Sequence, residues 1–547
     1  MKITDIVLLG LAVLALPSYA QPDNNLPSRS LTIEGVYNAD VTDARKVMPV
    51  PAKPEILSSE SPVEYIREAR PLNGYLRDPM LAPDSPESEP PSYSGLIRFG
   101  YGMFGNIDAL ANARIRIKEN DILRINGKLN GWNGMLEDDW TSRMYDAGFS
   151  AGFEHNLSRL KIGVNAGVGY QYVNFRPSPA QFQKHDPRDN GRNIMTGNIE
   201  ATVSCPDMAG IYFNVLAGWY ACSDDNISHD VSLKGRENLF RVKGFAGYDI
   251  SQSWSVGLWG SAKASLYDWR NRLRFSFDYV DYVTVSARPQ VSWTNTSLSA
   301  VAGFDVTVRN RIAPKIRVAP YLRLQYKVSS WLALFADVTG GAEDNDMRRF
   351  YAISPYWTDR EQLTDGYTRM DVSLGAIWNA NEFLEVSGRG GYRIMAGHLF
   401  QSLSALDVMG SVLTQSDATV GYGEISASLT TSDRLKASAT AGYYKWKCDG
   451  DGEQLQMLPE FGISIDIEGK LSDKLTMNAG YQYALMTSCA DERLPQVNIL
   501  DVSLGYRVQS NLDIALKGTN LLGNRYYKYG GYRAQGAAIL GSLLFRF

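Results

Sequence analysis

After residue 20 the sequence contains no run of about 20 apolar residues, although 44% of its residues are hydrophobic. This absence excludes helical membrane spans, so membrane insertion would require a closed β-barrel. Histidine is also rare, and none of the four histidines has the His-Glu-x-x-His spacing of a metal site. No other catalytic constellation stands out, so we expect neither an enzyme nor a cofactor. The net charge of −4 argues against a nucleic-acid partner.

The first 20 residues have the order of a secretory signal peptide. Lys2 precedes an apolar run over residues 6–16, and the small-residue pattern Ser18-Tyr19-Ala20 follows. The apolar run is too short to cross about 30 Å of hydrocarbon, which argues against an N-terminal membrane anchor. We therefore predict export, with Gln21 as the first residue of the mature chain.

The last segment of the chain alternates apolar and polar residues with the period of two that places successive side chains on opposite faces of a strand. Leu543 and Phe547 fall on the apolar face, whereas Ser542 and Arg546 fall on the other. A strand that ends on an aromatic residue resembles the signal read by the machinery that assembles proteins into the outer membrane of Gram-negative bacteria. We assign this signal to Phe545 and Phe547.

The same alternation recurs upstream, over residues 160–172, 369–378 and 500–507. In each segment, charged or amide side chains lie opposite apolar ones, which is typical of a barrel with a polar lumen and a lipid-facing outer wall. The charged residues assigned to the inner faces are the lumen-facing candidates: Arg124, Lys128, Lys161, Arg369, Asp371, Asp501, Arg507 and Arg546.

Short and long connections alternate along the chain. This is the pattern of a transmembrane barrel, in which short periplasmic turns alternate with longer extracellular loops. One of the long connections spans residues 341–367. The short connections include residues 119–121, 251–253, 379–381 and 432–434. Counting from residue 94, the pattern predicts an all-β fold, a transmembrane antiparallel β-barrel of about 22 strands over residues 94–547. Between residues 282 and 327 the turns are ambiguous, because prolines interrupt the pattern.

Residues 21–93 hold 12 of the 23 prolines, so we interpret them as an extended periplasmic leader and linker. A barrel of about 22 strands normally has a plugged lumen. Three ways of filling it are open: the leader lies inside the barrel, the loops fold inward, or a partner enters it. Of these, we favour a leader that governs access to the lumen.

Two motifs carry a family resemblance. Residues 518–527, Gly-Thr-Asn-Leu-Leu-Gly-Asn-Arg-Tyr-Tyr, and the ending Phe545-Arg546-Phe547 look like the last two strands of TonB-dependent receptors. The Tyr- and Gly-rich residues 98–105 resemble a plug-poor group of such receptors in Bacteroidetes. The resemblance implies solute transport or binding across the Gram-negative outer membrane. The alternative is a non-transporting barrel subunit of a larger outer-membrane assembly.

The chain departs from this family ahead of the barrel. Residues 21–93 are too few for the family's folded plug and contain no clear energy-coupling box, so TonB-powered uptake does not follow from the resemblance. The partners it implies are outer-membrane lipid and a periplasmic or outer-membrane protein. No motif names the solute.

Aromatic residues in the long connections are candidates for ligand contact, with anchoring at the membrane interface as the alternative. They are Tyr351, Tyr356, Trp357 and Tyr527. The charged residues over 343–349 predict a solvated surface loop. Cys448 and Cys489 fall at the same rim in neighbouring hairpins, in a compartment where disulfides persist, so we expect a disulfide between them.

Overall fold

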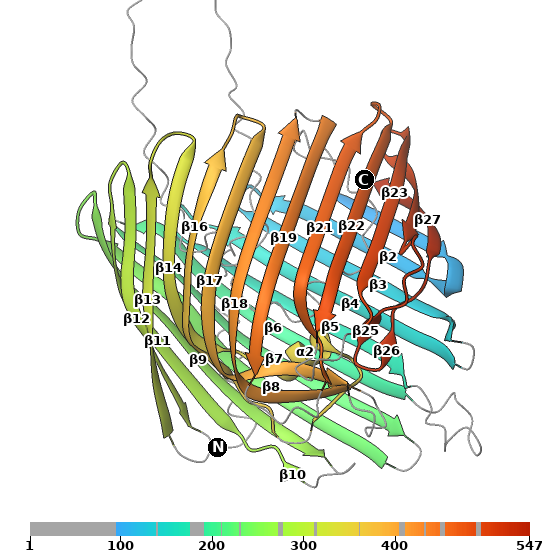
Figure 1. Cartoon of the computed structure of the whole chain (residues 1–547), viewed down its shortest axis with the longest axis horizontal. Helices are drawn as coiled ribbons and strands as arrows, with labels where there is room; N and C mark the ends of the chain where they lie inside the picture. The colour runs from blue at the N-terminus through green and yellow to red at the C-terminus, as the bar shows by residue number, and fades with distance from the viewer. Residues whose placement is uncertain are drawn as a thin grey trace, which may run out of the picture. The chain divides into compact units, whose positions relative to one another are not determined.

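The computed structural model describes the barrel part of the chain and leaves residues 1–93 outside the described residues. It covers residues 94–137, 140–175, 191–208, 210–228, 231–271, 277–310, 314–359, 362–403, 411–431, 434–448, 455–487 and 494–547. These residues are all-β, as predicted, and form a closed antiparallel barrel of 22 strands (Figure 1). No helix among them has the length and apolar character needed to cross a membrane. The signal peptide and the leader stay predictions.

The barrel wall follows the chain order. Its strands are β1 (Gly95–Gly102), β2 (Ile107–Lys118), β3 (Asp121–Glu137), β4 (Trp140–Asn156), β5 (Lys161–Asn174), β6 (Gly191–Met208), β7 (Ile211–Ser228), β8 (Val231–Asp249), β9 (Trp254–Asn271), β11 (Tyr282–Thr294), β12 (Leu298–Asn310), β13 (Pro314–Lys327), β14 (Leu332–Glu343), β16 (Gly366–Asn379), β17 (Leu384–Leu403), β18 (Ser411–Thr431), β19 (Leu435–Cys448), β21 (Leu458–Lys470), β22 (Leu475–Thr487), β23 (Val497–Gln509), β24 (Leu512–Thr519) and β27 (Ala538–Arg546). Short elements lie in the connections: η3 (Met103–Gly105), β10 (Phe277–Asp278), α2 (Met347–Ile353), β15 (Trp357–Asp359), β20 (Leu455–Gln456), β25 (Tyr527–Tyr529) and β26 (Tyr532–Arg533).

The first and last strands close the barrel. β1 pairs antiparallel with β27, from Leu96 opposite Arg546 to Gly102 opposite Leu540. Beyond the last ladder pair, the Gly95 amide donates to the Phe547 carbonyl and the Phe547 amide donates to the Gly95 carbonyl, both at 3.0 Å. Because the sheet closes on itself, its wall presents no edge with unpaired backbone groups.

The two faces of the wall differ as the alternation predicts. On β27, Leu543 and Phe545 are 52% and 43% exposed on the outside, whereas Ser542 and Leu544 are buried. On β13, Ile316 and Val318 face outward and are exposed, so their alternate neighbours face the lumen. The outer face is therefore an apolar belt, and the polar side chains of the wall line its interior.

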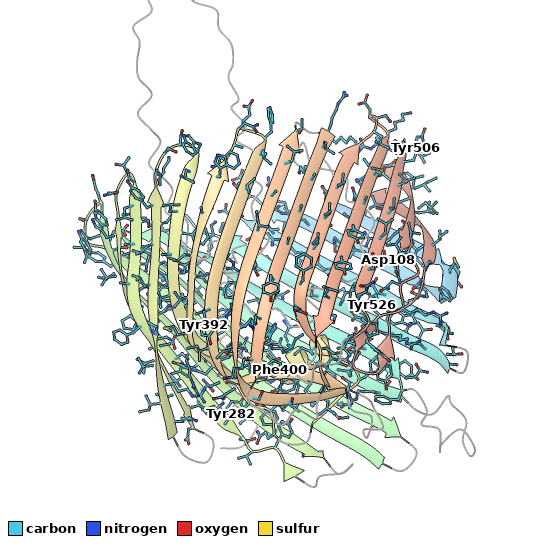
Figure 2. All side chains as sticks on the ribbon, viewed as in Figure 1. Asp108, Tyr282, Tyr392, Phe400, Tyr506 and Tyr526 are labelled. Carbon is cyan, nitrogen blue, oxygen red and sulfur yellow. The ribbon has the colours of Figure 1, made fainter. Side chains whose placement is uncertain are left out.

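The two ends of the barrel have different connections. At one end, which we call the short-turn rim, Ser251 Oγ accepts from the Trp254 amide at 3.1 Å and Asn381 Oδ1 accepts from the Leu384 amide at 2.9 Å. Such side-chain bonds stabilise tight turns. At the other end, the long-loop rim, lie α2, β10, β25 and β26 (Figure 1). Figure 2 shows Tyr282 and Phe400 toward the long-loop rim and Tyr506 near the short-turn rim.

The segment with ambiguous turns forms β11, β12 and β13, and its prolines lie where the ladders allow them. The ladder between β11 and β12 omits Pro289, and the ladder between β13 and β14 begins only at Leu322, beyond Pro320. Pro314 opens β13. Proline has no backbone N–H to donate, so it is tolerated at strand starts and at interruptions of a ladder.

We predict that Phe547 contributes to barrel assembly through both its ring and its main chain. Deleting Phe547 removes the exposed ring and the two hydrogen bonds to Gly95, whereas Phe547→Ala removes the ring alone. Both variants should reach the outer membrane at severalfold lower levels than wild type, and the deletion should be the more severe. Leu543→Ala, on the same outer face, is the control. Wild-type membrane levels with unchanged heat-modifiable migration for the deletion would contradict this assignment.

Candidate functional site: the barrel lumen and the loop that crosses it

Three neighbouring strands carry irregularities close to the long-loop rim. The ladders shift between Thr339 and Gly341 in β14, between Thr368 and Met370 in β16, and between Met395 and His398 in β17. Gly341 has a φ of 140°, and a Cβ there would meet the Asp305 carboxylate at 3.3 to 3.5 Å. Because β-bulges bend strands and redirect the chain, they position the connection from β14 to β16 to turn inward. We call the described residues of this connection, 344–359 and 362–365, the lumen loop.

Apolar side chains of the lumen loop pack on the inner wall. They form one cluster with residues of β6, β7, β17 and β18. The loop contributes Met347, Phe350, Tyr351, Ile353, Trp357 and Leu363, and the wall contributes Ile194, Cys222, Leu399 and Leu413. The rings of Phe350 and Trp357 lie 5.1 Å apart in an edge-on arrangement. Burying each large apolar side chain stabilises the packed loop by about 1.5–3 kcal/mol.

A buried lysine holds the end of the lumen loop. Lys263 of β9 is 1% exposed and its ammonium donates to Asp365 Oδ1. The other donors to this carboxylate are the Thr284 hydroxyl at 2.8 Å, the Tyr282 hydroxyl at 3.2 Å and the Asn345 amide at 2.9 Å. Asp365 therefore ties the loop to β9 and β11 and also joins the two ends of the loop.

An arginine holds the beginning of the loop. The Nη2 atom of Arg241, in β8, lies 3.0 Å from Asp344 Oδ2 and 3.7 Å from Asp346 Oδ2. Asp346 also caps α2, because its Oδ1 accepts from the Arg349 amide at 2.9 Å. Burial alone would raise the pKa of Asp346, but Arg348, the Arg349 amide and Arg241 outweigh burial and lower that pKa below its ordinary value. Its contribution to stability is thus present at neutral pH and lost only as pH falls through the lowered pKa.

A second arginine holds the middle of the loop. Arg192 of β6 donates to the Pro355 carbonyl at 3.1 Å and to the Trp357 carbonyl at 2.8 Å, and its Nε lies 3.3 Å from Asp224. Tyr351 of α2 donates to the same Asp224 at 2.6 Å. Arg192 is 2% exposed, so this part of the loop is attached through a desolvated, charged side chain.

Hydrogen bonds attach the lumen loop to the facing strand β18. Ser411 Oγ and Ser354 Oγ lie 3.1 Å apart, and Thr358 donates to the Ser411 carbonyl at 3.2 Å. The Thr364 amide donates to Gln415 Oε1 at 2.8 Å. β15 pairs with β18 in parallel. Since the same loop contacts β6 to β12 on one side and β18 on the other, it crosses the lumen (Figure 1).

The connection between β24 and β27 meets the lumen loop. Tyr532 of β26 stacks on Tyr356 with ring centroids 3.6 Å apart, and Tyr529 lies 5.6 Å away. Asn520, with a φ of 47°, folds this connection by donating to the carbonyls of Asn524 and Gln535. The motif that carried the family resemblance thus forms a turn held by Asn520, which supports an aromatic contact with the lumen loop.

Most lumen-facing candidates from the sequence take part in ion pairs or hydrogen bonds along the wall. The contacts are Arg124 with Glu154 at 2.9 Å, Lys128 with Asp146 at 2.6 Å, Arg369 with Asp417 at 2.6 Å, Asp371 with Arg393 at 2.8 Å, Arg507 with Asp513 at 3.9 Å, Arg546 with Asp513 at 2.6 Å, and Asp501 with the Asn520 amide at 2.7 Å. Lys161 is exposed at the start of β5. A direct role of these residues in binding stays a prediction.

The loop residues are placed differently from the sequence expectation. The segment predicted as a charged surface loop is the start of the lumen loop, where Asn345 and Asp346 are buried. Tyr351, Tyr356 and Trp357 are at most 5% exposed, because they pack within the loop and against the wall. Ligand contact by these three and by the half-buried Tyr527 stays a prediction.

Sequence reasoning missed the basic residues that hold the lumen loop: Arg192, Arg241, Lys263 and Arg309. The signal in the sequence was their place on the polar face of alternating strands, which predicts that they point into the lumen. The expected bridge between Cys448 and Cys489 stays a prediction, since Cys489 lies outside the described residues. In the described part of the chain, no group of three or more His, Cys, Asp or Glu side chains is arranged to hold a metal ion.

These features define the fold of the described residues, a large closed antiparallel barrel, which is also the fold of several solved outer-membrane receptors. The structure is similar to the siderophore receptor PirA from Acinetobacter baumannii, with a TM-score of 0.64, 11% identity and coverage of 83% of this chain and 80% of that one. It is also similar to the FrpB iron transporter from Neisseria meningitidis, with a TM-score of 0.66, 8% identity and coverage of 86% and 83%. For P. aeruginosa FpvA the TM-score is 0.63 at 12% identity, with coverage of 83% and 72%.

The predicted resemblance to TonB-dependent receptors is confirmed at the level of the barrel fold. At 8–12% identity, these similarities establish the fold alone. No family model matches the chain, and no curated protein matches it either.

We predict that Lys263→Met loosens the lumen loop. The substitution leaves Asp365 buried without its charge partner, which costs about 3–5 kcal/mol for a buried pair. Amide hydrogen exchange over residues 344–359 should accelerate, while exchange in β3 and β4 stays unchanged. The control is Lys128→Met, whose 50% exposed side chain pairs with Asp146 in a contact worth about 0–1 kcal/mol. Unchanged lumen-loop exchange in Lys263→Met would show that this ion pair does not anchor the loop.

Proposed function

We propose that this chain is an outer-membrane barrel for the binding and passage of a solute, and that the lumen loop is its gate. The apolar outer belt and the closed ladder suit a bilayer, in which every backbone polar group must be paired within the protein. The polar inner wall suits a water-soluble solute. Short turns at one rim and longer connections at the other favour a periplasmic and an extracellular end, respectively.

One observation carries the assignment of a gate: charged and polar side chains attach the lumen loop to both sides of the wall. Buried ion pairs add little net stability compared with apolar packing of the same volume, because desolvation offsets most of their attraction. A loop held in this way can be released when a solute supplies competing charges. A loop held by apolar contacts alone would have no charged bonds for which a solute could compete.

The similar solved structures support passage rather than a purely structural role. Their names describe receptors and transporters for siderophores, iron and copper. Those ligands belong to those proteins, and the solute of this chain is a separate question. The alternative, a non-transporting subunit of an outer-membrane assembly, has no observation in its favour among the described residues.

We predict that a disulfide across the lumen will hold the gate closed. Ser354, at the end of α2, and Ser411, at the start of β18, have hydroxyl oxygens 3.1 Å apart, so Ser354→Cys combined with Ser411→Cys should form a bridge. In planar bilayers, wild type should show opening events, the oxidised double variant should show severalfold fewer, and reductant should restore them.

Each single cysteine variant is the control, because it carries one substitution and no engineered bridge. Equal opening in the oxidised and reduced double variant would reject the lumen loop as the gate. If wild type, single variants and the reduced double variant all fail to conduct while correctly folded, the transport proposal fails and the subunit alternative is favoured.

A further inference from the structure

A cleft lies where the end of the lumen loop meets the inner wall. It is formed by β11, β12, β13 and the junction of the loop with β16. The lining residues are Thr284, Thr307, Arg309, Lys315, Arg317, Ala342, Asp365, Gly366 and Tyr367. The lining thus combines three basic side chains and several hydroxyl groups with one carboxylate, that of Asp365.

The basic residues of the cleft outnumber the carboxylates that could pair with them. Asp365 already binds Lys263, and the Asp305 carboxylate interacts with Arg288 and accepts from the Thr307 hydroxyl at 2.8 Å. In the part of the chain that the structure describes, no carboxylate forms a salt bridge with Arg309, Lys315 or Arg317, and Asp417 acts on Arg317 only from a longer distance. Cations gathered in this way on one wall attract an anion.

A buried hydroxyl in the same cleft has no hydrogen-bond partner among the described residues. It belongs to Tyr367, which is 3% exposed. The Arg317 guanidinium lies 4.9 Å from the centre of the Tyr367 ring, so the phenol and one of the unbalanced cations are neighbours. A buried polar group without a partner costs free energy comparable to a lost hydrogen bond, and a bound acceptor would remove that cost.

We propose that this cleft binds an oxyanion, a carboxylate or phosphate group of the solute. Arg309, Lys315 and Arg317 supply the positive charge, the guanidinium groups can donate in pairs to the oxygens, and Tyr367 donates a further hydrogen bond. This inference names a solute class for the proposed passage and rests on it for its biological role. The binding itself depends only on the geometry of the wall.

The site is also connected to the gate. Arg309 donates to Thr364 Oγ at 3.0 Å and to the Asp365 carbonyl at 2.6 Å, so it holds the end of the lumen loop. An anion in the cleft competes with these acceptors for the Arg309 guanidinium. Binding of the solute therefore weakens one attachment of the loop.

The test measures binding to the purified full chain in detergent by titration calorimetry at low ionic strength. The two probes are inorganic phosphate and citrate, which separate a phosphate site from a carboxylate site. We expect Arg317→Gln to weaken binding about tenfold, as for the loss of one charged hydrogen bond, and Tyr367→Phe to weaken it about threefold. Lys128→Gln is the control: it removes a lumen charge that is paired with Asp146, and it should leave the affinity unchanged.

Binding of one probe only assigns the site to that oxyanion. No binding of either probe to wild type, or equal affinity in wild type, Arg317→Gln and Tyr367→Phe, would overturn the proposal. An equal loss in Lys128→Gln would do the same, because it would show a general effect of lumen charge. Bilayer conductance is recorded separately, so a chain that conducts without binding anions rejects this inference and leaves the proposed passage standing.

Discussion

The closed backbone ladder is the constraint on which the rest of the structure depends. In a bilayer no water is available to backbone groups, so a sheet has to close, as β1 and β27 do through the paired main chains of Gly95 and Phe547. Closing 22 strands creates an interior that wall side chains alone cannot fill. The polar lumen, and the need for something to occupy it, both follow from that closure.

The lumen loop places one segment of the chain inside the barrel, packed on the inner wall. Its apolar residues provide most of the packing, whereas Arg192, Arg241 and Lys263 fix its position, because charged hydrogen bonds are directional and apolar contacts are not. The cleft beside Arg309 uses the same chemistry with one difference: its cations form no salt bridge with a carboxylate of the described residues. An anion there and the loop itself therefore share one basic residue, Arg309.

The sequence predicts the wall well, because alternation of apolar and polar residues depends only on neighbouring positions in the chain. The outward Leu374 and the inward Asp371 follow directly from a period of two. The interior depends instead on contacts between distant residues: Lys263 and Asp365 are 102 positions apart, and Arg192 and Trp357 are 165 apart. In the sequence, Tyr356 and Trp357 are of the residue types that anchor barrels at the membrane interface. The loop that brings them inside leaves the wall beside the bulges in β14, β16 and β17, and bulges leave no clear mark in the alternation.

The most direct test of the account is the single-channel conductance of a variant in which residues 345–364 are replaced by a short glycine–serine link. Glu343 and Gly366 are paired across β14 and β16, so a short turn can join these strands without disturbing the wall. If the lumen loop closes the lumen, the shortened chain will form a large, permanently open pore, whereas wild type will be mostly closed. Equal conductance in the two correctly folded chains would contradict the account.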